Sequence, residues 1–312
     1  MRLRTFLCNV FLAFACCLIG MSSVARARAL NSEAQYEQRI QAALQENHLD
    51  AAESLARQAV AAEPRSARAY QLLGVVLFKK QAPDQAREAF KRSIELDPKS
   101  PETYFDLALL ELSQNRYGEA VAPLEACVRL DPDNAQAHLL LGRADHNLNR
   151  TLPAIEQFKK AIQLSPRLPL AHYHLGYAYQ SQGELEAALG EYRKEIEVHP
   201  GFYDAYWLAG NIELEHGQLA SAEALFRQGI QLRPEGTQAH YGLARVLLAG
   251  KHLDEAETEL KAVLKETPGD LEAHYTLARV YQQMGRKQDA EREYQTVQAM
   301  RARNQAGTPG TP

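Results

Sequence analysis

Residues 172–192 read HYHLGYAYQSQGELEAALGEY, and the order of small and aromatic residues in this stretch decides the fold. Residues at i, i+3, i+4 and i+7 share one face of a helix, and here those positions hold His172, Leu175, Gly176 and Tyr179. Gly183 then interrupts the pattern, and a second amphipathic helix is predicted from Leu185 to Val198. The stretch therefore predicts two short helices joined by a tight turn.

The same arrangement recurs every 34 residues, and four columns keep this register. The first column is a closing proline: Pro64, Pro98, Pro132, Pro166, Pro200, Pro234 and Pro268. The second is alanine throughout: Ala52, Ala86, Ala120, Ala154, Ala188, Ala222, Ala256 and Ala290. The third is small as well: Gly74, Ala108, Gly142, Gly176, Gly210, Ala244 and Ala278. The fourth is mostly large: Ala56, Phe90, Leu124, Phe158, Tyr192, Phe226, Leu260 and Tyr294. Four columns in register over eight units identify an internal repeat.

The ends of the expected helices carry residues that favour such ends. Asn and Gly accept the left-handed conformation that ends a helix. Six units place one of them after the first helix: Asn47, Asn115, Asn149, Gly183, Gly217 and Gly285. Ser100, Pro101 and Glu102 begin another unit with a capping hydroxyl, a proline at the first helical position and an acid in the first turn. Each unit is therefore predicted to be a pair of helices.

The period and the columns resemble the tetratricopeptide repeat, whose pattern is W-x2-L-G-x2-Y followed by Ala, an aromatic residue, Ala and Pro. The resemblance covers eight units: 33–66, 67–100, 101–134, 135–168, 169–202, 203–236, 237–270 and 271–304. It implies an all-α fold, a right-handed superhelical solenoid of antiparallel helix pairs over residues 28–304. The first unit has Arg39-Ile40 where Leu-Gly is usual, and the last lacks its proline. The polar residues 305–312 are expected to be a disordered tail.

The start of the chain differs from the repeats. A basic beginning is followed by an apolar run over residues 5–20 and then by Ala25-Arg26-Ala27, which has the form of a secretory signal peptide. Cleavage after Ala27 is the favoured prediction and cleavage after Ala29 the second, so we expect an exported protein, periplasmic or secreted. The alternative is that residues 5–21 remain as a membrane anchor, although roughly 20 apolar residues are needed to span a bilayer.

Charge and cysteine content exclude several classes of function. Removal of Arg2, Arg4 and Arg26 with the leader changes the formal net charge from −4 to −7. The basic residues are dispersed among acids, so we expect no nucleic-acid partner. Only Cys127 lies outside the leader, and one thiol forms no intramolecular disulfide. The chain has no phosphate loop, G-x-S-x-G or H-E-x-x-H motif, so neither catalysis nor a cofactor is expected.

A column of histidines raises the question of a metal site. Its members are His138, His172, His240 and His274, at a position where the family usually has a large aromatic residue. A zinc ion needs each nitrogen about 2.0–2.1 Å away, whereas equivalent residues of successive repeats lie at least a helix diameter apart. We expect these rings to have a packing role, and Cys127 to be a core thiol, with no metal bound.

A second stripe on the first helices is the candidate binding surface. It lies roughly 130° from the core-facing side at about 100° per residue, and the resemblance implies that it lines the inner, concave surface. We call it the inner stripe, and its residues are Phe105, Leu109, Arg143, Tyr173, Tyr177, Trp207, Asn211, Tyr241, Arg245, Tyr275, Arg279 and Gln282. Aromatic residues beside arginines are typical of protein-binding hot spots. The family consensus itself favours an aromatic and an asparagine at these positions, so a structural role stays open.

These features predict a scaffold that mediates protein–protein interaction. A peptide segment or a helix of a protein partner is expected in the groove, with the arginines pairing with acidic groups or backbone carbonyls. Chaperone-binding members of the family use a set that includes lysines, and this chain has none at positions 170, 173, 204, 207, 238 and 241. The alternative function is a membrane-anchored assembly factor for an envelope or secretion complex, which contacts the membrane through its retained N-terminal segment.

Overall fold

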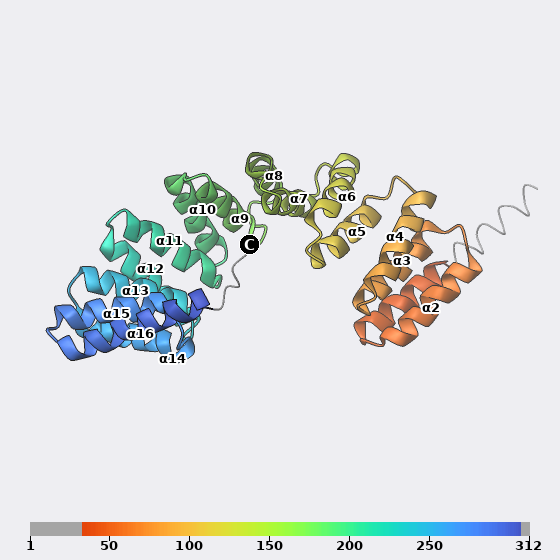
Figure 1. The fold of residues 1–312 in the computed structure, drawn as a ribbon. Coiled ribbons are helices and arrows are strands. Elements are labelled where there is room, and N and C mark those ends of the chain that lie inside the picture. The colour runs from red at the N-terminus through yellow and green to blue at the C-terminus, as the bar shows by residue number, and fades with distance from the viewer. Residues whose placement is uncertain (1–32, 307–312) are drawn as a thin grey trace, which may run out of the picture. The chain divides into compact units, whose positions relative to one another are not determined.

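The computed structural model describes residues 33–306, and every regular element in that range is an α-helix. The helices form two compact units, which divide at Leu148 and Asn149, inside the fourth repeat. Within each unit the helices follow one another as tandem pairs (Figure 1). The predicted all-α solenoid of helix pairs is confirmed. The predicted signal peptide lies outside the described residues, and its cleavage stays a prediction.

The first unit consists of three helix pairs and one further helix. Residues 33–45 form its first helix. The others are α2 (Leu49–Ala62), α3 (Ala67–Lys79), α4 (Pro83–Leu96), α5 (Pro101–Ser113), α6 (Tyr117–Leu130) and α7 (Ala135–Asn147).

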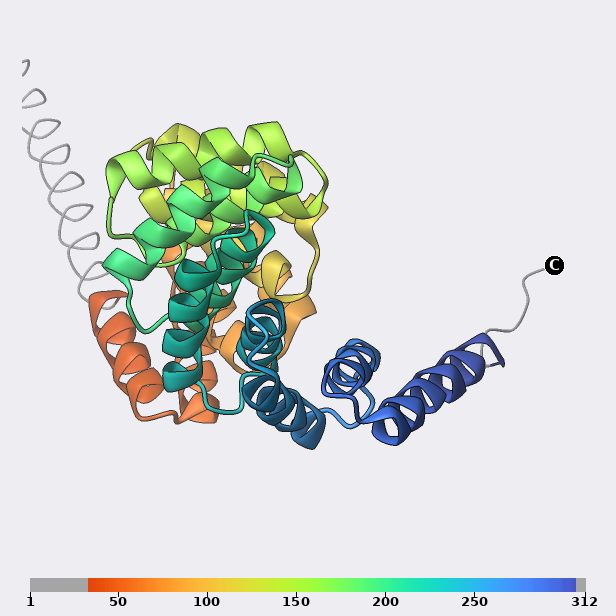
Figure 2. The same ribbon diagram turned by 90° about the vertical axis from the view of Figure 1, so that its left-hand side faces the viewer.

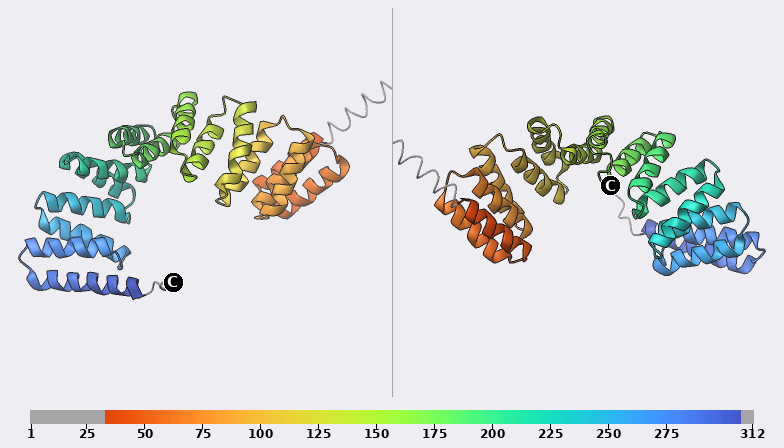
Figure 3. Two further views of the ribbon diagram at one scale, coloured as in Figure 1. Left: turned by 45° about the horizontal axis from the view of Figure 1, so that its top comes forward. Right: turned by 180° about the vertical axis from the view of Figure 1, so that it is seen from behind.

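The second unit continues the same alternation of helices. Its elements are α8 (Thr151–Leu164), α9 (Ala171–Ser181), α10 (Leu185–Val198), α11 (Tyr203–Glu215), α12 (Leu219–Leu232), α13 (Thr237–Ala249), α14 (Leu253–Glu266), α15 (Leu271–Gln283) and α16 (Lys287–Ala306). Helices α11 to α16 pack in chain order, as two further views show (Figure 3). Helix α16 is the longest of them and reaches Ala306, inside the segment expected to be disordered (Figure 2).

The turn inside each pair contains one residue in the left-handed conformation. All six positions predicted from Asn and Gly have positive φ: Asn47, Asn115, Asn149, Gly183, Gly217 and Gly285. The same repeat position in the other two units holds Gln81 and Lys251, whose φ values are 60° and 62°. The sequence did not indicate these two, because Gln and Lys have no preference for this conformation. The backbone of the repeat therefore imposes the turn even where the side chain does not favour it.

The third and fourth columns meet inside each pair. A Cβ added to Gly74 would lie 2.5 Å from the Phe90 ring, and one added to Gly210 would lie 2.8 Å from the Phe226 ring. Gly176 has the same relation to Tyr192, at 2.8 Å. Where the fourth column holds the smaller leucine, the third holds alanine, and these pairs are fully buried: Ala108 with Leu124, and Ala244 with Leu260. In these five pairs the residue volumes in the two columns are therefore matched.

One ring is enclosed from two sides. Phe226 on α12 is fully buried and faces Gly210 of its own pair. A Cβ at Gly242, on the first helix of the next repeat, would overlap the same ring. The glycine–ring contact thus joins neighbouring repeats as well as the two helices of one repeat.

Helix α9 begins differently from the other first helices. Ser66, Ser100, Asn134 and Asp270 each cap a helix by accepting a backbone N–H three residues ahead. Before α9, Leu170 is left-handed, with φ 68°, and its side chain forms no cap. The fully buried carboxylate of Glu195 on α10 accepts the N–H groups of Leu170 and Tyr173 at 3.1 and 3.2 Å instead. Glu195 stands in the small buried column of Ser93 and Cys127, and the residue pattern did not indicate its capping role.

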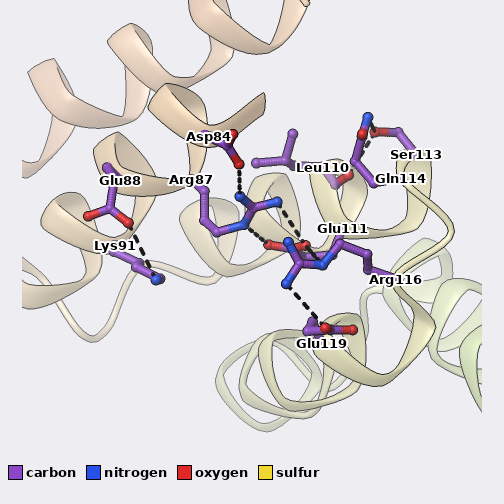
Figure 4. A network of polar contacts seen from close by, with 10 residues as sticks. All are labelled: Asp84, Arg87, Glu88, Lys91, Leu110, Glu111, Ser113, Gln114, Arg116 and Glu119. Carbon is purple, nitrogen blue, oxygen red and sulfur yellow. Dashed lines mark hydrogen bonds and ion pairs between the residues drawn. The ribbon is translucent and has the colours of Figure 1, made fainter. Parts of the chain in front are cut away.

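Charged groups also join neighbouring repeats. Glu111 on α5 is 3% exposed, and its carboxylate accepts hydrogen bonds from Arg87 on α4, the nearer at 2.6 Å. Arg116 lies 3.3 Å from the other oxygen of Glu111 (Figure 4). In the second unit Glu213, at the same repeat position, pairs with Arg193 on α10. The Arg87–Glu111 pair is largely buried on both sides, and breaking it leaves a charge without compensation, which is strongly destabilising.

The glycine–ring contact makes a prediction for stability. Gly210→Ala should lower the free energy of unfolding of the full chain by about 1–3 kcal/mol, because its Cβ and the Phe226 ring overlap. Gly190→Ala is the matched control: no atom lies within 4 Å of its Cβ position on α10. It should raise stability by about 0.5–1 kcal/mol, since glycine is costly inside a helix. Urea unfolding followed by circular dichroism measures both, and equal effects would contradict the contact. In a Phe226→Leu background the cost of Gly210→Ala should shrink.

Candidate protein-binding face

Two members of the histidine column, His240 and His274, lie between a carboxylate and a backbone carbonyl. In His240, Nδ1 lies 2.5 Å from Glu259 and Nε2 lies 2.8 Å from the carbonyl oxygen of Pro234, the closing proline of the preceding repeat. His274 repeats this with Glu293 at 2.5 Å and Pro268 at 3.0 Å. Both neighbours of His240 are acceptors, so a His240 ring that donates to both carries two protons. Within the described residues no group of three His, Cys, Asp or Glu could hold a metal ion.

The one described cysteine is a core thiol. Cys127 is fully buried on α6 among the apolar residues of the first unit. Burial raises its pKa to about 11, so the reactive thiolate form is scarce at neutral pH.

In the first unit, the inner stripe lies beside a chain of internal hydrogen bonds. Phe105 and Leu109 are half-buried against the local core, and Arg143 is half-buried on α7. Beside them a polar chain links three successive first helices: Arg68 pairs with Glu37 and donates to Gln71, and Gln71 donates to Asp106. Burial raises the pKa of Asp106 despite the hydrogen bond from Gln71. The sequence analysis did not predict this series of hydrogen bonds. It pairs the polar groups of this face with one another inside the protein.

In the second unit, the inner stripe begins with two tyrosines on α9. Tyr173 is half-buried, and its ring centroid lies 5.0 Å from that of Phe202 and 6.3 Å from that of Tyr177. Burial raises the pKa of Tyr173, so it belongs partly to the packing between repeats. Tyr177 is 46% exposed and presents its ring to solvent.

Trp207 and Asn211 continue the stripe on α11. Both are half-buried. Trp207 packs against the apolar clusters of both neighbouring repeats, and its Nε1 donates to Asp204 at 3.0 Å. The indole is therefore held in place by one hydrogen bond while part of its surface stays exposed.

A pocket of about 450 Å³ follows, formed by α11, α13, α15 and the turn after α13. Four residues of the inner stripe line it: Tyr241, Arg245, Tyr275 and Arg279. The hydroxyl of Tyr241 lies 3.3 Å from that of Thr276, and the guanidinium of Arg245 lies 6.0 Å from the centre of the Tyr241 ring. Tyr275 is 41% exposed. The structure thus brings these four predicted residues together on the second unit.

Gln282 does not line this pocket. It accepts a hydrogen bond from Tyr294 on α16 at 3.1 Å, and the lining residue is Gln283. Gln283 lies four positions after Arg279 and Gln282 lies three. In an α-helix the residue four positions on is closer to the same face. Two further lining residues, Lys251 and Glu272, were not in the predicted stripe.

Comparison with known families agrees with the repeat geometry. Tetratricopeptide repeat models match residues 37–101, 173–236, 213–270, 258–306 and 89–122, and a TPR repeat model matches residues 149–183. The chain belongs to the tetratricopeptide repeat family. Membership of this family makes it a protein-interaction scaffold. The chain matches no curated protein.

Solved structures share this tetratricopeptide fold. A crystal structure of MamA is 29% identical with a TM-score of 0.51, and the match covers 52% of this chain and 95% of MamA. PilF of Pseudomonas aeruginosa is 20% identical with a TM-score of 0.60, over 68% of this chain and 96% of PilF. YrrB, described as a TPR protein with an unusual peptide-binding site, is 21% identical with a TM-score of 0.53, over 63% of this chain and 97% of its own.

The histidine bridges predict a stability that depends on pH. The hydrogen bond to Glu259 raises the pKa of His240, and the Pro234 carbonyl acts in the same direction. A raised folded-state pKa stabilises the fold fully below the unfolded value of about 6.5, and this contribution is lost as pH rises through the folded pKa. His240→Gln should therefore lower the urea midpoint more at pH 5.5 than at pH 8.5. His252→Gln, at an exposed histidine of the same unit, is the control. A loss independent of pH would show that the imidazolium contributes nothing.

Proposed function

We propose that this tetratricopeptide protein is an exported scaffold that binds a peptide segment or a helix of a partner protein along the inner stripe of its second unit. One observation carries the proposal: the pocket gathers two tyrosines and two arginines that come from equivalent positions of successive first helices. Aromatic and arginine side chains dominate the binding energy of protein interfaces. The rings are already oriented by packing, so little side-chain freedom is lost on binding.

The packing of the inner stripe supports different roles for its packed and its exposed aromatic rings. Tyr173 and Trp207 are held by Phe202 and Asp204, so they supply a fixed apolar floor. Tyr177 and Tyr275 are the most exposed rings of the stripe, so they have the most surface to cover with a ligand. The pocket volume lies within the range of ligand sites, which runs from about 300 to 1,000 Å³. It suits a few side chains of a segment that continues along the stripe.

The first unit has a different part in this proposal. Its polar chain from Glu37 to Asp106 is satisfied internally, and a ligand would have to replace those hydrogen bonds. Phe105, Leu109 and Arg143 remain candidate contacts, but the second unit offers the better-formed site.

Export rests on the leader alone. The signal-peptide pattern of residues 1–27 favours a periplasmic or secreted protein, and the retained anchor of an assembly factor is the alternative. No helix among the described residues is long and apolar enough to cross a membrane. The choice between the two forms therefore depends on what happens to the leader.

Site-specific photocrosslinking tests the binding face. A benzophenone amino acid at Tyr241 or Tyr275 should yield a crosslinked partner in the native cell, because both rings line the pocket. The same residue at Leu232, which is 43% exposed on the second helix α12, is the matched control and should yield none. Adducts from Leu232 alone would place the contact on the other helices and reject the proposed face. Trp207→Ala with Tyr241→Ala should reduce the Tyr275 adduct at least tenfold.

The N-terminus of the mature protein tests export. Cleavage after Ala27 gives a chain that begins at Arg28, and the second predicted site gives one that begins at Leu30. Mass spectrometry of the protein purified from its native host measures this directly. A chain that still begins at Met1 and sediments with membranes would favour the anchored assembly factor.

A further inference from the structure

We infer that the pocket between α13 and α15 selects a partner segment with an internal acidic side chain next to a large apolar one. This inference rests on the proposed function and adds the chemical class of the ligand. It concerns charge and polarity at one place on the inner stripe, which the general proposal leaves open.

The cations of the pocket have no acidic partner among residues 33–306. Arg245, Arg279 and Lys251 line it, and among the described residues their side chains form no hydrogen bond or ion pair. Other arginines of the unit are held by acids, for example Arg227 by Glu223 at 2.8 Å and Arg286 by Glu257 at 2.8 Å. Folding therefore uses those charges and leaves the pocket cations available to a ligand.

One acid, Glu272, stands among the described residues that line the pocket, and it does not neutralise the cations. It is exposed in the first turn of α15, where a carboxylate favours the positive end of the helix dipole. One carboxylate against three cations leaves the lining with an excess of positive charge. A ligand with a carboxylate complements this excess, and a basic ligand is repelled.

The partial burial of Arg245 favours an acidic ligand over a neutral one. Arg245 is already half-buried above the Tyr241 ring. A segment that covers it removes more water from the guanidinium, and a buried charge without a partner is costly. A carboxylate replaces the lost water with charge-assisted hydrogen bonds, which are the stronger kind. A neutral segment offers only uncharged carbonyl or hydroxyl oxygens, which accept hydrogen bonds but do not compensate the positive charge.

The remaining lining calls for an apolar neighbour. Leu214, Leu248 and Ala249 contribute the aliphatic wall, and Tyr241 and Tyr275 contribute two rings. An aromatic or aliphatic side chain fills this wall while the adjacent carboxylate reaches the arginines. Trp207 on α11 holds the equivalent position one repeat before Tyr241 and packs against the same apolar cluster, so a ligand that follows the inner stripe extends past the pocket. This continuity favours an acidic side chain inside a segment over a terminal carboxylate.

Libraries of random nine-residue peptides, selected for binding to the full-length protein, test the inference while the natural partner is still unidentified. One library holds the peptides between two flexible linkers, and a second ends in a free carboxylate. We expect the linker-flanked library to yield peptides enriched at least tenfold in Asp or Glu next to Phe, Tyr, Trp or Leu. Binding of those peptides should weaken at least tenfold when the acid is changed to its amide.

Charge reversal assigns the effect to the pocket. Arg245→Glu with Arg279→Glu should abolish binding of the acidic peptides and select peptides with Lys or Arg instead. Arg167→Glu, at an exposed position before α9, is the matched control and should leave binding unchanged. Circular dichroism and the urea midpoint verify that each variant is folded.

Each other outcome overturns the inference. If neutral peptides bind the wild-type protein and the charge-reversed variant equally well, the pocket does not select acidic segments. The proposed binding face still stands in that case if Tyr241 crosslinks to its partner. Enrichment only in the library with a free C-terminus rejects the internal acid. An absence of enriched peptides in both libraries rejects the pocket as a peptide site, and failed crosslinking at Tyr241 and Tyr275 rejects the proposed function itself.

Discussion

The fold depends on the close approach of two helices at a residue without a side chain. At Gly210 and Gly242 a ring of the second helix occupies the space that a Cβ would need. A single aromatic residue, Phe226, can therefore hold its own helix pair together and join the next pair to it. Two solutions recur within this chain, glycine against a ring and alanine against leucine, while the last repeat has Ala278 with Tyr294. Because the contact is local and repeated, the buried apolar residues form successive clusters along each unit.

Polar interactions add to this packing where the repeats meet. The pairs made by Glu111 and Glu213 each link a second helix to the first helix of the next repeat. The bridges of His240 and His274 connect the closing proline carbonyl of one repeat to a glutamate of the next repeat's second helix. Buried polar groups of this kind are costly when left without a partner, so they favour one register of neighbouring repeats over alternatives.

The sequence predicted the fold almost completely, because each column reports a contact made within about 34 residues. The helix pairs and their turns follow from such contacts, and even the bounds of α10 agree with the prediction. What escaped prediction depends on the backbone or on distant partners. Lys251 takes a conformation that its residue type does not indicate, and Glu195 reaches from one helix to cap another. The division at Leu148 has no counterpart in the unbroken register of the columns.

The lining of the candidate site was predictable to the extent that helix geometry fixes which side chains share a face. That geometry brought Tyr241 and Tyr275 together with their arginines, but it could not distinguish satisfied from unsatisfied polar groups. The two units show why this distinction matters. In the first, Arg68 is held by Glu37, and the polar face is closed by its own hydrogen bonds. In the second, Arg245 is half-buried with its guanidinium over the Tyr241 ring, and it forms no ion pair with the described residues. A charge kept partly out of water without a counterion costs free energy in the unbound protein. This unpaired charge does not stabilise the fold, whereas a ligand that supplies the counterion would bind more tightly because of it. The unpaired arginine is therefore stronger evidence for a binding function than the ring beside it.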